Sequence, residues 1–302
     1  MIELKVGTRK SALALNQTDK VIKKLSAIGI SCRIVEITTR GDTTGDMPIR
    51  NISGSGIFVS EIERQLRIKE IDIAVHSLKD LTDINNNDLV ISAILQRENP
   101  SDAFISRDYP SLESLPPGAV VGTSSVRRIS QLKAFRSDLN IKDIRGNVDT
   151  RLKKLYCGDY SALIMAAAGL IRLGLKDKIK QIMDIDDFTP VRGQGIIVVQ
   201  TRKEDRELNK IIEKIDDIDT RNCFEIELAF TRVINGGCLT PVGVCCLKKG
   251  DLYTLYAYIG DISGRNIKRK IEKKNMTTDD AMFLANQMKK EGRDIIERIK
   301  NK

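Results

Sequence analysis

The chain has 302 residues, 41% of them hydrophobic, and 50 Lys and Arg against 41 Asp and Glu give it a net charge of +9. That length is enough for two or three domains with substantial cores, and no apolar run is long enough to cross a bilayer. The positive charge suits an anionic partner, but a 4% aromatic content without tryptophan argues against a platform that stacks single-stranded nucleic acid.

The first part of the chain alternates short apolar strands with helical segments. KVGT is a strand end, and Ser11 is placed to cap a helix over residues 12–25. A second strand over 31–39 leads into a glycine-bearing stretch, and a helical run follows over 57–69. IDIAVH, at residues 71–76, is rich in Ile and Val and predicts a strand of the buried parallel type.

The alternation continues after Glu98 to Ser101, where ENPSD predicts a crossing into another domain. The strand AVVG leads into a helix over residues 126–135, IKDI leads into VDTRLKKLYCG, and the strand ALIMAA leads into AGLIRLG. From Asn222 a third segment begins, and its pattern is of the α+β type.

Two strand-to-helix joints resemble each other, VGTRKSALALNQ from Val6 and VGTSSVRRISQ from Val121. Free amides at a helix N-terminus bind anions, and a nearby hydroxyl adds a donor. Simple N-capping explains either joint alone. Two such joints in successive α/β units suggest a pair of similar lobes that close on an anionic ligand, at the carboxyl ends of the strands.

Cationic and polar side chains gather at these predicted strand ends: Arg9, Ser11, His76, Ser77, Lys79, Thr123, Ser124, Ser125, Arg127, Arg128, Arg145, Asn147, Arg151 and Arg172. The planar fork of arginine pairs with carboxylate or phosphate, so a ligand with several such groups fits. Asp80 stands among them, and its role is either to face positive charge that develops during a reaction or to cap a helix or pair with an arginine.

The six cysteines form no CxxC pair and no disulfide framework, and His76 is the only histidine, so we expect a reduced protein without a metal site. The N-terminus has no signal-peptide core. Cys238 lies between glycines in INGGCLTPVG, a shaped loop. It is either a small residue in a turn or a site that carries a group covalently.

These motifs together resemble the porphobilinogen deaminase family, also called hydroxymethylbilane synthase, over nearly the whole chain. Ten segments in this order are highly specific, although each alone is weak evidence: GTRKSALALNQ, RGD, GIFVSEIE, DIAVHSLKD, DAFISR, VGTSSVRR, RGNVDTRL, AAAGLIRLGL, GQG and GGCLTPVG.

The resemblance implies an α/β fold with two periplasmic-binding-protein-like, doubly wound lobes around a cleft, and a small α+β C-terminal domain that carries the cofactor loop. The implied domains are residues 1–97 with 193–215, residues 98–192, and residues 216–302.

The family joins four porphobilinogen molecules head to tail with release of ammonia, and then hydrolyses the chain to hydroxymethylbilane. The resemblance implies a dipyrromethane cofactor bound covalently through Cys238. Loss of ammonia leaves an azafulvenium cation, which Asp80, the match to the family's catalytic aspartate, would stabilise. Arg9 is implied in proton delivery during deamination.

Further matched positions would line a wall of donors for the acetate and propionate groups of the pyrroles. Those implied to bind the cofactor are Ser11, Lys79, Thr123, Ser125, Arg127, Arg128, Arg145 and Asn147. Those implied to bind the substrate are Arg9, Gln17, Phe58, Arg145, Arg151 and Arg172. Phe58 fits a hydrophobic core equally well.

One region departs from the family pattern. Several members carry lysines ahead of GIFVSEIE, where this chain has Asn51 and Ser55. Residues 43–56 suggest a lid over the cleft, with Arg50 as a partial substitute for the missing charges. Asp42, in RGD, has a better claim to structure than to chemistry.

Two other classes fit less of the sequence. A non-catalytic anion-binding protein of the same two-lobed fold explains the arginines but gives no role to GGC or to a third domain. A nucleic-acid-binding protein is suggested by net charge alone. We therefore expect a transferase that acts on a small molecule, porphobilinogen, as a cytoplasmic monomer without a nucleic-acid, membrane or metal partner.

Overall fold

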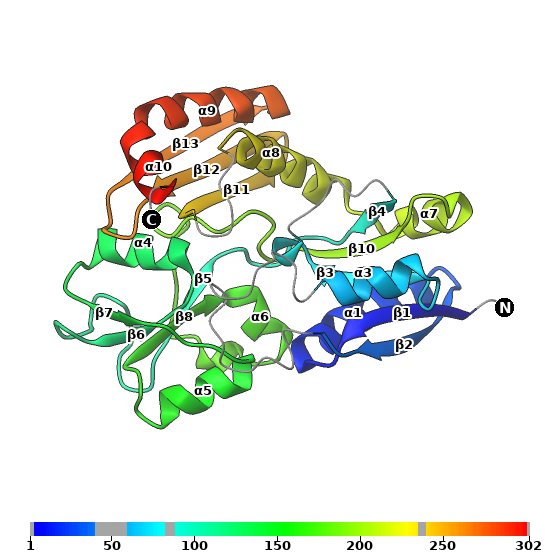
Figure 1. Cartoon of the computed structure of the whole chain (residues 1–302), viewed down its shortest axis with the longest axis horizontal. Helices are drawn as coiled ribbons and strands as arrows, with labels where there is room; N and C mark the ends of the chain where they lie inside the picture. The colour runs from blue at the N-terminus through cyan, green and yellow to red at the C-terminus, as the bar shows by residue number, and fades with distance from the viewer. Residues whose placement is uncertain (1–2, 40–58, 82–87, 235–239, 301–302) are drawn as a thin grey trace. The chain divides into compact units, whose positions relative to one another are not determined.

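The computed structural model describes residues 3–39, 59–81, 88–234 and 240–300. The chain divides into two compact units, one formed by Met1–Glu98 with Gly195–Arg221 and the other by Asn99–Gln194 with Asn222–Lys302 (Figure 1). It therefore enters the second unit after Glu98, returns after Gln194 and leaves the first unit again after Arg221. The finer division into three domains stays a prediction.

The first unit is built on a five-stranded sheet. In order across the sheet, the strands are β2 (Ser31–Ile37), β1 (Glu3–Arg9), β3 (Ile73–Ser77), β10 (Ile197–Arg202) and β4 (Leu89–Ile94). β1 runs parallel to β2 and β3, whereas β10 is antiparallel to β3 and β4. The prediction that β3 is a parallel strand is therefore correct for its pairing with β1 and wrong for its pairing with β10. The reason is that β10 enters the sheet as the chain returns from the second unit.

Helices cover both faces of this sheet. The helical segments are α1 (Ala12–Ser26), α3 (Ser60–Arg67), the 3-10 turn η2 (Leu78–Asp80), α7 (Arg206–Ile212) and the 3-10 turn η4 (Glu213–Ile215). α1 buries Val21 and Leu25 in one core together with Val75 of β3. α3 buries Leu66 in another core together with Ala74. Neighbouring residues of β3 lie in different cores because successive side chains along a strand point to opposite faces of the sheet.

The second unit repeats this plan in a second five-stranded sheet. In order, its strands are β7 (Asn140–Lys142), β6 (Val120–Gly122), β8 (Ala162–Ala166), β5 (Asp102–Ile105) and β9 (Gln181–Ile182). β6 is parallel to β7 and β8, and β5 is antiparallel to β8 and β9. β5 and β10 hold the same place in their sheets, and each is the first strand after the chain enters its unit. The repeat confirms the predicted fold class of two periplasmic-binding-protein-like α/β lobes.

Helices also lie on both faces of the second sheet. They are α4 (Val126–Phe135), α5 (Val148–Tyr156), α6 (Ala167–Arg172) and the 3-10 turn η3 (Lys176–Lys178). α4 buries Leu132 in one core with Val121 of β6. α5 and α6 bury Leu155 and Leu170 in another core with Leu163 of β8.

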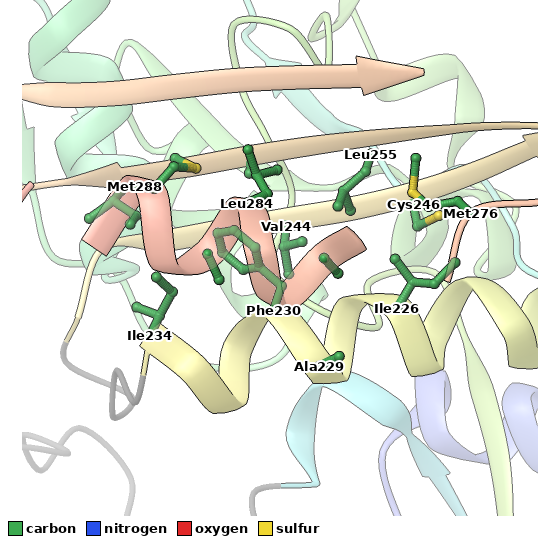
Figure 2. Close-up of a cluster of buried hydrophobic side chains, with 14 of the residues drawn as sticks. Ile226, Ala229, Phe230, Ile234, Val244, Cys246, Leu255, Met276, Leu284 and Met288 are labelled. Carbon is green, nitrogen blue, oxygen red and sulfur yellow. The ribbon is translucent and has the colours of Figure 1, made fainter. Parts of the chain in front are cut away.

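The rest of the second unit is the predicted α+β segment. Its elements are α8 (Ile218–Ile234), which begins within the first unit and enters the second at Asn222, then β11 (Val242–Lys249), β12 (Leu252–Gly260), β13 (Asn266–Lys274), α9 (Thr278–Glu291) and α10 (Arg293–Lys300). The three strands form an antiparallel sheet with β12 in the middle. Phe230 of α8, Leu255 of β12 and Leu284 of α9 share one buried cluster between the helices and the sheet (Figure 2).

Two close contacts join this segment to the rest of its unit. A Cβ atom at Gly243 would lie 2.6 Å from the carbonyl oxygen of Thr189, so only glycine lets β11 approach that backbone. The hydroxyl oxygens of Ser130, on α4, and Tyr258, on β12, lie 2.6 Å apart. The last glycine of GGCLTPVG therefore has a packing role.

Candidate active site

Asp80 lies at the end of the first unit's central strand. β3 ends at Ser77, and the short turn η2 follows with Leu78 buried and Asp80 exposed. Ser77, not Asp80, holds the N-cap position of this turn. Across the described ranges, no hydrogen bond or ion pair reaches the Asp80 carboxylate. Neither the helix-cap nor the salt-bridge interpretation of Asp80 therefore has support in the described residues.

A buried chain of hydrogen bonds supports the strand that carries Asp80. His76 Nε2 lies 3.1 Å from Gln200 Oε1, and Gln200 Nε2 donates to Glu63 Oε1 at 2.9 Å. Burial lowers the pKa of His76 to about 4, against a weaker opposing effect of its bond to Gln200, so the imidazole is neutral near pH 7. Nothing in the sequence pattern indicates these bonds, because the partners come from β3, β10 and α3.

Gln17 and Ser11 each form a hydrogen bond at the end of the first sheet where Asp80 lies. Gln17 is buried on α1, and its Nε2 donates to Ser77 Oγ at 2.8 Å. Ser11 is the N-cap of α1, and its hydroxyl accepts a bond from the Ala14 amide at 3.3 Å. Arg9 ends β1 and Lys79 lies in η2, each partly buried. The contacts of these residues with a ligand stay predictions.

The matching joint in the second unit has the same construction. Ser125 is the N-cap of α4, and its hydroxyl accepts a bond from the Arg128 amide at 3.5 Å. Thr123 Oγ1 accepts a bond from the Ser125 amide at 3.3 Å. Ser124 Oγ bonds to both the amide and the carbonyl of Ile144, at 3.0 and 2.9 Å. N-capping therefore occurs at both joints, and it leaves the free amides of each helix start in place.

Arg127 and Arg128 meet on one buried carboxylate, that of Asp102 at the start of β5. Arg127 Nη1 lies 2.8 Å from Asp102 Oδ2, and Arg128 Nη2 lies 2.7 Å from Asp102 Oδ1. Arg127 Nη1 also donates to Gln131 Oε1 at 3.0 Å and to the Thr189 carbonyl at 2.9 Å. Within the described part of the chain, the buried Nε atoms of both arginines have no hydrogen-bond partner.

The charge of this cluster follows from the burial of Asp102. Burial alone would raise the pKa of Asp102, but the charges of Arg127 and Arg128 and their hydrogen bonds outweigh it and hold that pKa well below its usual range. Asp102 is therefore ionised near pH 7, and one negative charge faces two positive charges. Sequence reasoning missed Asp102, although DAFISR places it at the first strand after the domain crossing.

The remaining cations of the second unit crowd one another. Loss of hydration, followed by the charges of Arg128 and Arg145, lowers the pKa of Arg151 to about 10. Arg151 Nε donates to the Gly146 carbonyl at 2.7 Å. Arg172 ends α6 and is buried, and Asn147 is the exposed N-cap of α5. The positive charges of Arg128 and Arg145 disfavour that of Arg151, and an anion bound beside Arg151 would relieve this repulsion.

The donor set fits a ligand that carries several carboxylates. Orphaned Nε–H groups and mutually repelling guanidiniums both gain from such a group. Across the described ranges, no cluster of three or more His, Cys, Asp or Glu could hold a metal ion, and no helix is long and apolar enough to cross a membrane. Cys238, Phe58, Asp42 and the predicted lid with Asn51 and Ser55 lie outside the described residues.

The chain matches the sequence model of a family described as "Porphobilinogen deaminase, dipyromethane cofactor binding domain" over residues 4–210. It is 44% identical to the porphobilinogen deaminase of Roseiflexus castenholzii over an alignment of 267 residues, and this alignment covers 88% of each chain. It is also 40% identical to the porphobilinogen deaminase of Oceanobacillus iheyensis over an alignment of 304 residues. This alignment covers 99% of this chain and 98% of that relative.

Solved structures resemble the chain more distantly. The methionine binding protein MetQ aligns with a TM-score of 0.46 and 14% identity over 70% of this chain and 89% of its own. A putative methionine-binding lipoprotein of Bacillus subtilis aligns with a TM-score of 0.44 and 15% identity over 72% of this chain and 94% of its own. Likenesses at this level carry no information about ligand or activity.

Proposed function

The chain belongs to the porphobilinogen deaminase family, and from that membership we propose how its residues carry out the reaction. The protein is a hydroxymethylbilane synthase. It deaminates four porphobilinogen molecules, joins them head to tail on a dipyrromethane primer, and releases the linear tetrapyrrole by hydrolysis. The mechanism rests on one observation: the Asp80 carboxylate, in the turn that follows β3, is exposed and has no hydrogen-bond or ion-pair partner among the described residues.

Asp80 is assigned the stabilisation of positive charge on the substrate. As ammonia leaves the aminomethyl group of porphobilinogen, the pyrrole becomes an azafulvenium cation. A carboxylate that is not already neutralised by a neighbouring cation attracts this charge more strongly than it attracts the uncharged pyrrole. We also propose that the same carboxylate accepts a proton from the pyrrole that has formed the new bond.

Arg9 is assigned a part in proton delivery to the departing amine. β1 is parallel to β3, so Arg9, the last residue of β1, and Asp80, in the turn after β3, lie at the same end of the sheet. A guanidinium is a very weak acid, so its role is to position the proton carrier and not to give up its own proton. Gln17 and Phe58 are proposed to lie near the substrate pyrrole.

The cations of the second unit are proposed to bind acetate and propionate groups. Arg127 and Arg128 each have an unpartnered Nε–H within the described residues, and the charge of Arg145 disfavours that of Arg151. Further proposed donors to these groups are Ser11 and Lys79 of the first unit, and Thr123, Ser125, Asn147 and Arg172 of the second. A growing pyrrole chain gains carboxylates at each step, so several donors are needed.

Cys238 is proposed as the attachment point of the cofactor through a thioether. It lies in the connection between α8, which ends at Ile234, and β11, which begins at Val242. A thiolate captures a carbon electrophile readily, and the resulting thioether is stable enough for many turnovers. The bound dipyrromethane supplies the pyrrole carbon to which the first substrate is joined.

We also propose that the protein is a transferase and that it works in the cytoplasm as a monomer. Its proposed activity involves no nucleic acid, membrane or metal. Among the described residues, the free cysteines Cys32, Cys157, Cys223, Cys245 and Cys246 are consistent with a reducing compartment. The decisive test of the mechanism is single-turnover deamination by holoenzyme with Asp80→Asn. Deamination at the wild-type rate would remove Asp80 from the mechanism.

A further inference from the structure

Asp102 brings together two side chains that a helix would otherwise separate. Arg127 and Arg128 are consecutive on α4, and consecutive side chains on a helix point about 100° apart. Both nevertheless bond to Asp102, one to each carboxylate oxygen, at 2.8 and 2.7 Å. The Asp102 side chain is fully buried, and it is the first residue of β5. Its carboxylate therefore decides where both guanidiniums lie.

The partners of the two guanidiniums leave one positive charge unbalanced. Besides Asp102, Arg127 bonds to the side-chain amide of Gln131 and to the carbonyl of Thr189, and Arg128 bonds to the carbonyl of Ile164. Arg128 Nη2 also lies 3.5 Å from Gln194 Oε1, and Gln194 Nε2 in turn donates to Asp102 Oδ1 at 2.9 Å. All these other partners are neutral, so one carboxylate faces two cations.

Arg127 and Arg128 also have hydrogen-bond donors that are not used within the described residues. The Nε–H groups of Arg127 and Arg128 are buried and have no partner across the described ranges. A buried donor without a partner is costly, and the cost is relieved when an acceptor binds. The pair therefore offers two open donors and a single net positive charge, which matches one carboxylate.

We propose that Asp102 is a positioning residue that holds Arg127 and Arg128 as a pair and cancels one of their two charges, so that the pair binds one pyrrole carboxylate at a time and releases it. This inference rests on the proposed function of these arginines as carboxylate ligands. A chain that lengthens by one pyrrole in each cycle must pass its carboxylates along fixed donors. A site with two uncompensated charges would retain a carboxylate too strongly for that movement.

The charge argument makes opposite predictions for two substitutions. Asp102→Asn keeps the size of the side chain and leaves two uncompensated guanidiniums, so it should strengthen anion binding. Gln131→Glu adds a second carboxylate 3.0 Å from Arg127 Nη1, so it should weaken anion binding. Loss of packing would instead impair anion binding in both variants, because each replacement disturbs the same buried network.

A matched control exists in the first unit. Arg202 is also buried, and it donates from Nη1 to the carbonyls of Leu66 and Ile71 and from Nε to Asp205 at 2.7 Å. Asp205→Asn removes the nearer of two carboxylates beside a buried arginine that we do not place in the site, because Asp72 Oδ1 also lies 3.9 Å from Arg202 Nη2. It reports what such a loss does to stability alone.

The experiment measures competitive inhibition of each holoenzyme by succinate against porphobilinogen, together with the melting temperature. We expect the inhibition constant to fall about tenfold in Asp102→Asn and to rise about tenfold in Gln131→Glu, with no change in Asp205→Asn. Equal inhibition constants, or shifts in the same direction for the two site variants, would overturn the inference. If Asp102→Asn does not fold, Gln131→Glu alone decides, because unchanged or tighter inhibition contradicts the charge argument.

One further variant separates this inference from the proposed function on which it rests. Arg127→Leu should weaken succinate inhibition if Arg127 binds a carboxylate. Unchanged inhibition in Arg127→Leu would overturn the role of Arg127 in binding. Weaker inhibition in Arg127→Leu with no response in Asp102→Asn and Gln131→Glu would keep that role and overturn only the role of Asp102.

Discussion

Ser11 and Ser125 hold the same position in the two units. Each is the N-cap of the helix that follows a strand, and each accepts a bond from the amide three residues later, at 3.3 and 3.5 Å. The repeated joint therefore combines a stabilising cap with a helix N-terminus suited to an anion. Capping and ligand binding are separable because different side chains cap equally well.

Substitution at Ser125 separates the two roles. Asp and Asn both cap helices as well as Ser, so Ser125→Asp and Ser125→Asn should each keep the free energy of unfolding within about 0.5 kcal/mol of wild type. Ser125→Asp should lower kcat/KM at least about tenfold, because its charge repels the pyrrole carboxylates, whereas Ser125→Asn should lose far less. Denaturant unfolding and steady-state kinetics measure both. Equal activity in the two variants would show that no anion binds at this helix start.

The stability of the protein should depend on pH through His76. Its pKa is about 4 in the folded protein against 6.5 as the ordinary value, so the unfolded chain takes up the proton first as the pH falls. The contribution is fully present above pH 6.5 and is lost as the pH falls toward 4, by about 3 kcal/mol in all.

Replacement of His76 provides the comparison. It is the only histidine of the chain, so His76→Gln should flatten the fall in unfolding free energy between pH 6.5 and pH 4. Denaturant unfolding of both proteins across this range measures the difference. Parallel curves for wild type and His76→Gln would mean that the imidazole does not stay neutral in the folded protein.

Arg151 and Arg127 should differ in their contributions to the free energy of unfolding. Arg151 is repelled by Arg128 and Arg145, so Arg151→Leu should leave stability unchanged or raise it slightly while it lowers turnover. Arg127 is tied into a buried ion pair, so Arg127→Leu should lower the free energy of unfolding by about 3 kcal/mol.

The two arginine variants are compared by thermal melts and by the mass of enzyme-bound intermediates. Arg151→Leu should accumulate a particular chain length, because different carboxylates reach different donors as the chain grows. A stability loss in Arg151→Leu as large as that in Arg127→Leu, with a wild-type pattern of intermediates, would assign Arg151 to the fold and not to the site.

Local features of the sequence predicted the elements that carry the site. The helix expected over residues 126–135 is α4 with the same bounds, and the helix expected over 12–25 is α1, which ends one residue later. Both begin at a serine cap and carry a periodic apolar face, and such signals act over a few residues.

Contacts between distant segments could not be predicted in this way. The antiparallel direction of β10 depends on where the chain returns to its unit. The meeting of Asp102 with Arg127 joins residues 25 positions apart, and that of His76 with Gln200 joins residues 124 positions apart. Arg127 is identifiable in the sequence as a cation near a strand end, but its bonds to Asp102, Gln131 and the Thr189 carbonyl appear only in the fold.

Attachment of the cofactor is tested by the mass of intact protein. Wild-type holoenzyme should exceed the mass of the bare polypeptide by two linked pyrrole units, and Cys238→Ala should carry no such addition and show almost no turnover. Cys157→Ala is the control, because Cys157 is an exposed thiol with no assigned role. An active Cys238→Ala protein with the added mass would place the attachment at another residue.

Single-turnover deamination by preassembled holoenzyme tests the role of Asp80 most directly. Asp80→Asn keeps the shape and removes the charge, and it should slow ammonia release by about a hundred- to a thousandfold or more, the range found for loss of one transition-state donor. Asp80→Glu moves the charge by one methylene and should retain part of the rate, because the cation is spread over the pyrrole. Both variants should melt near the wild-type temperature, since Asp80 is exposed. A wild-type rate in Asp80→Asn, or a lowered melting temperature as its only defect, would contradict the account.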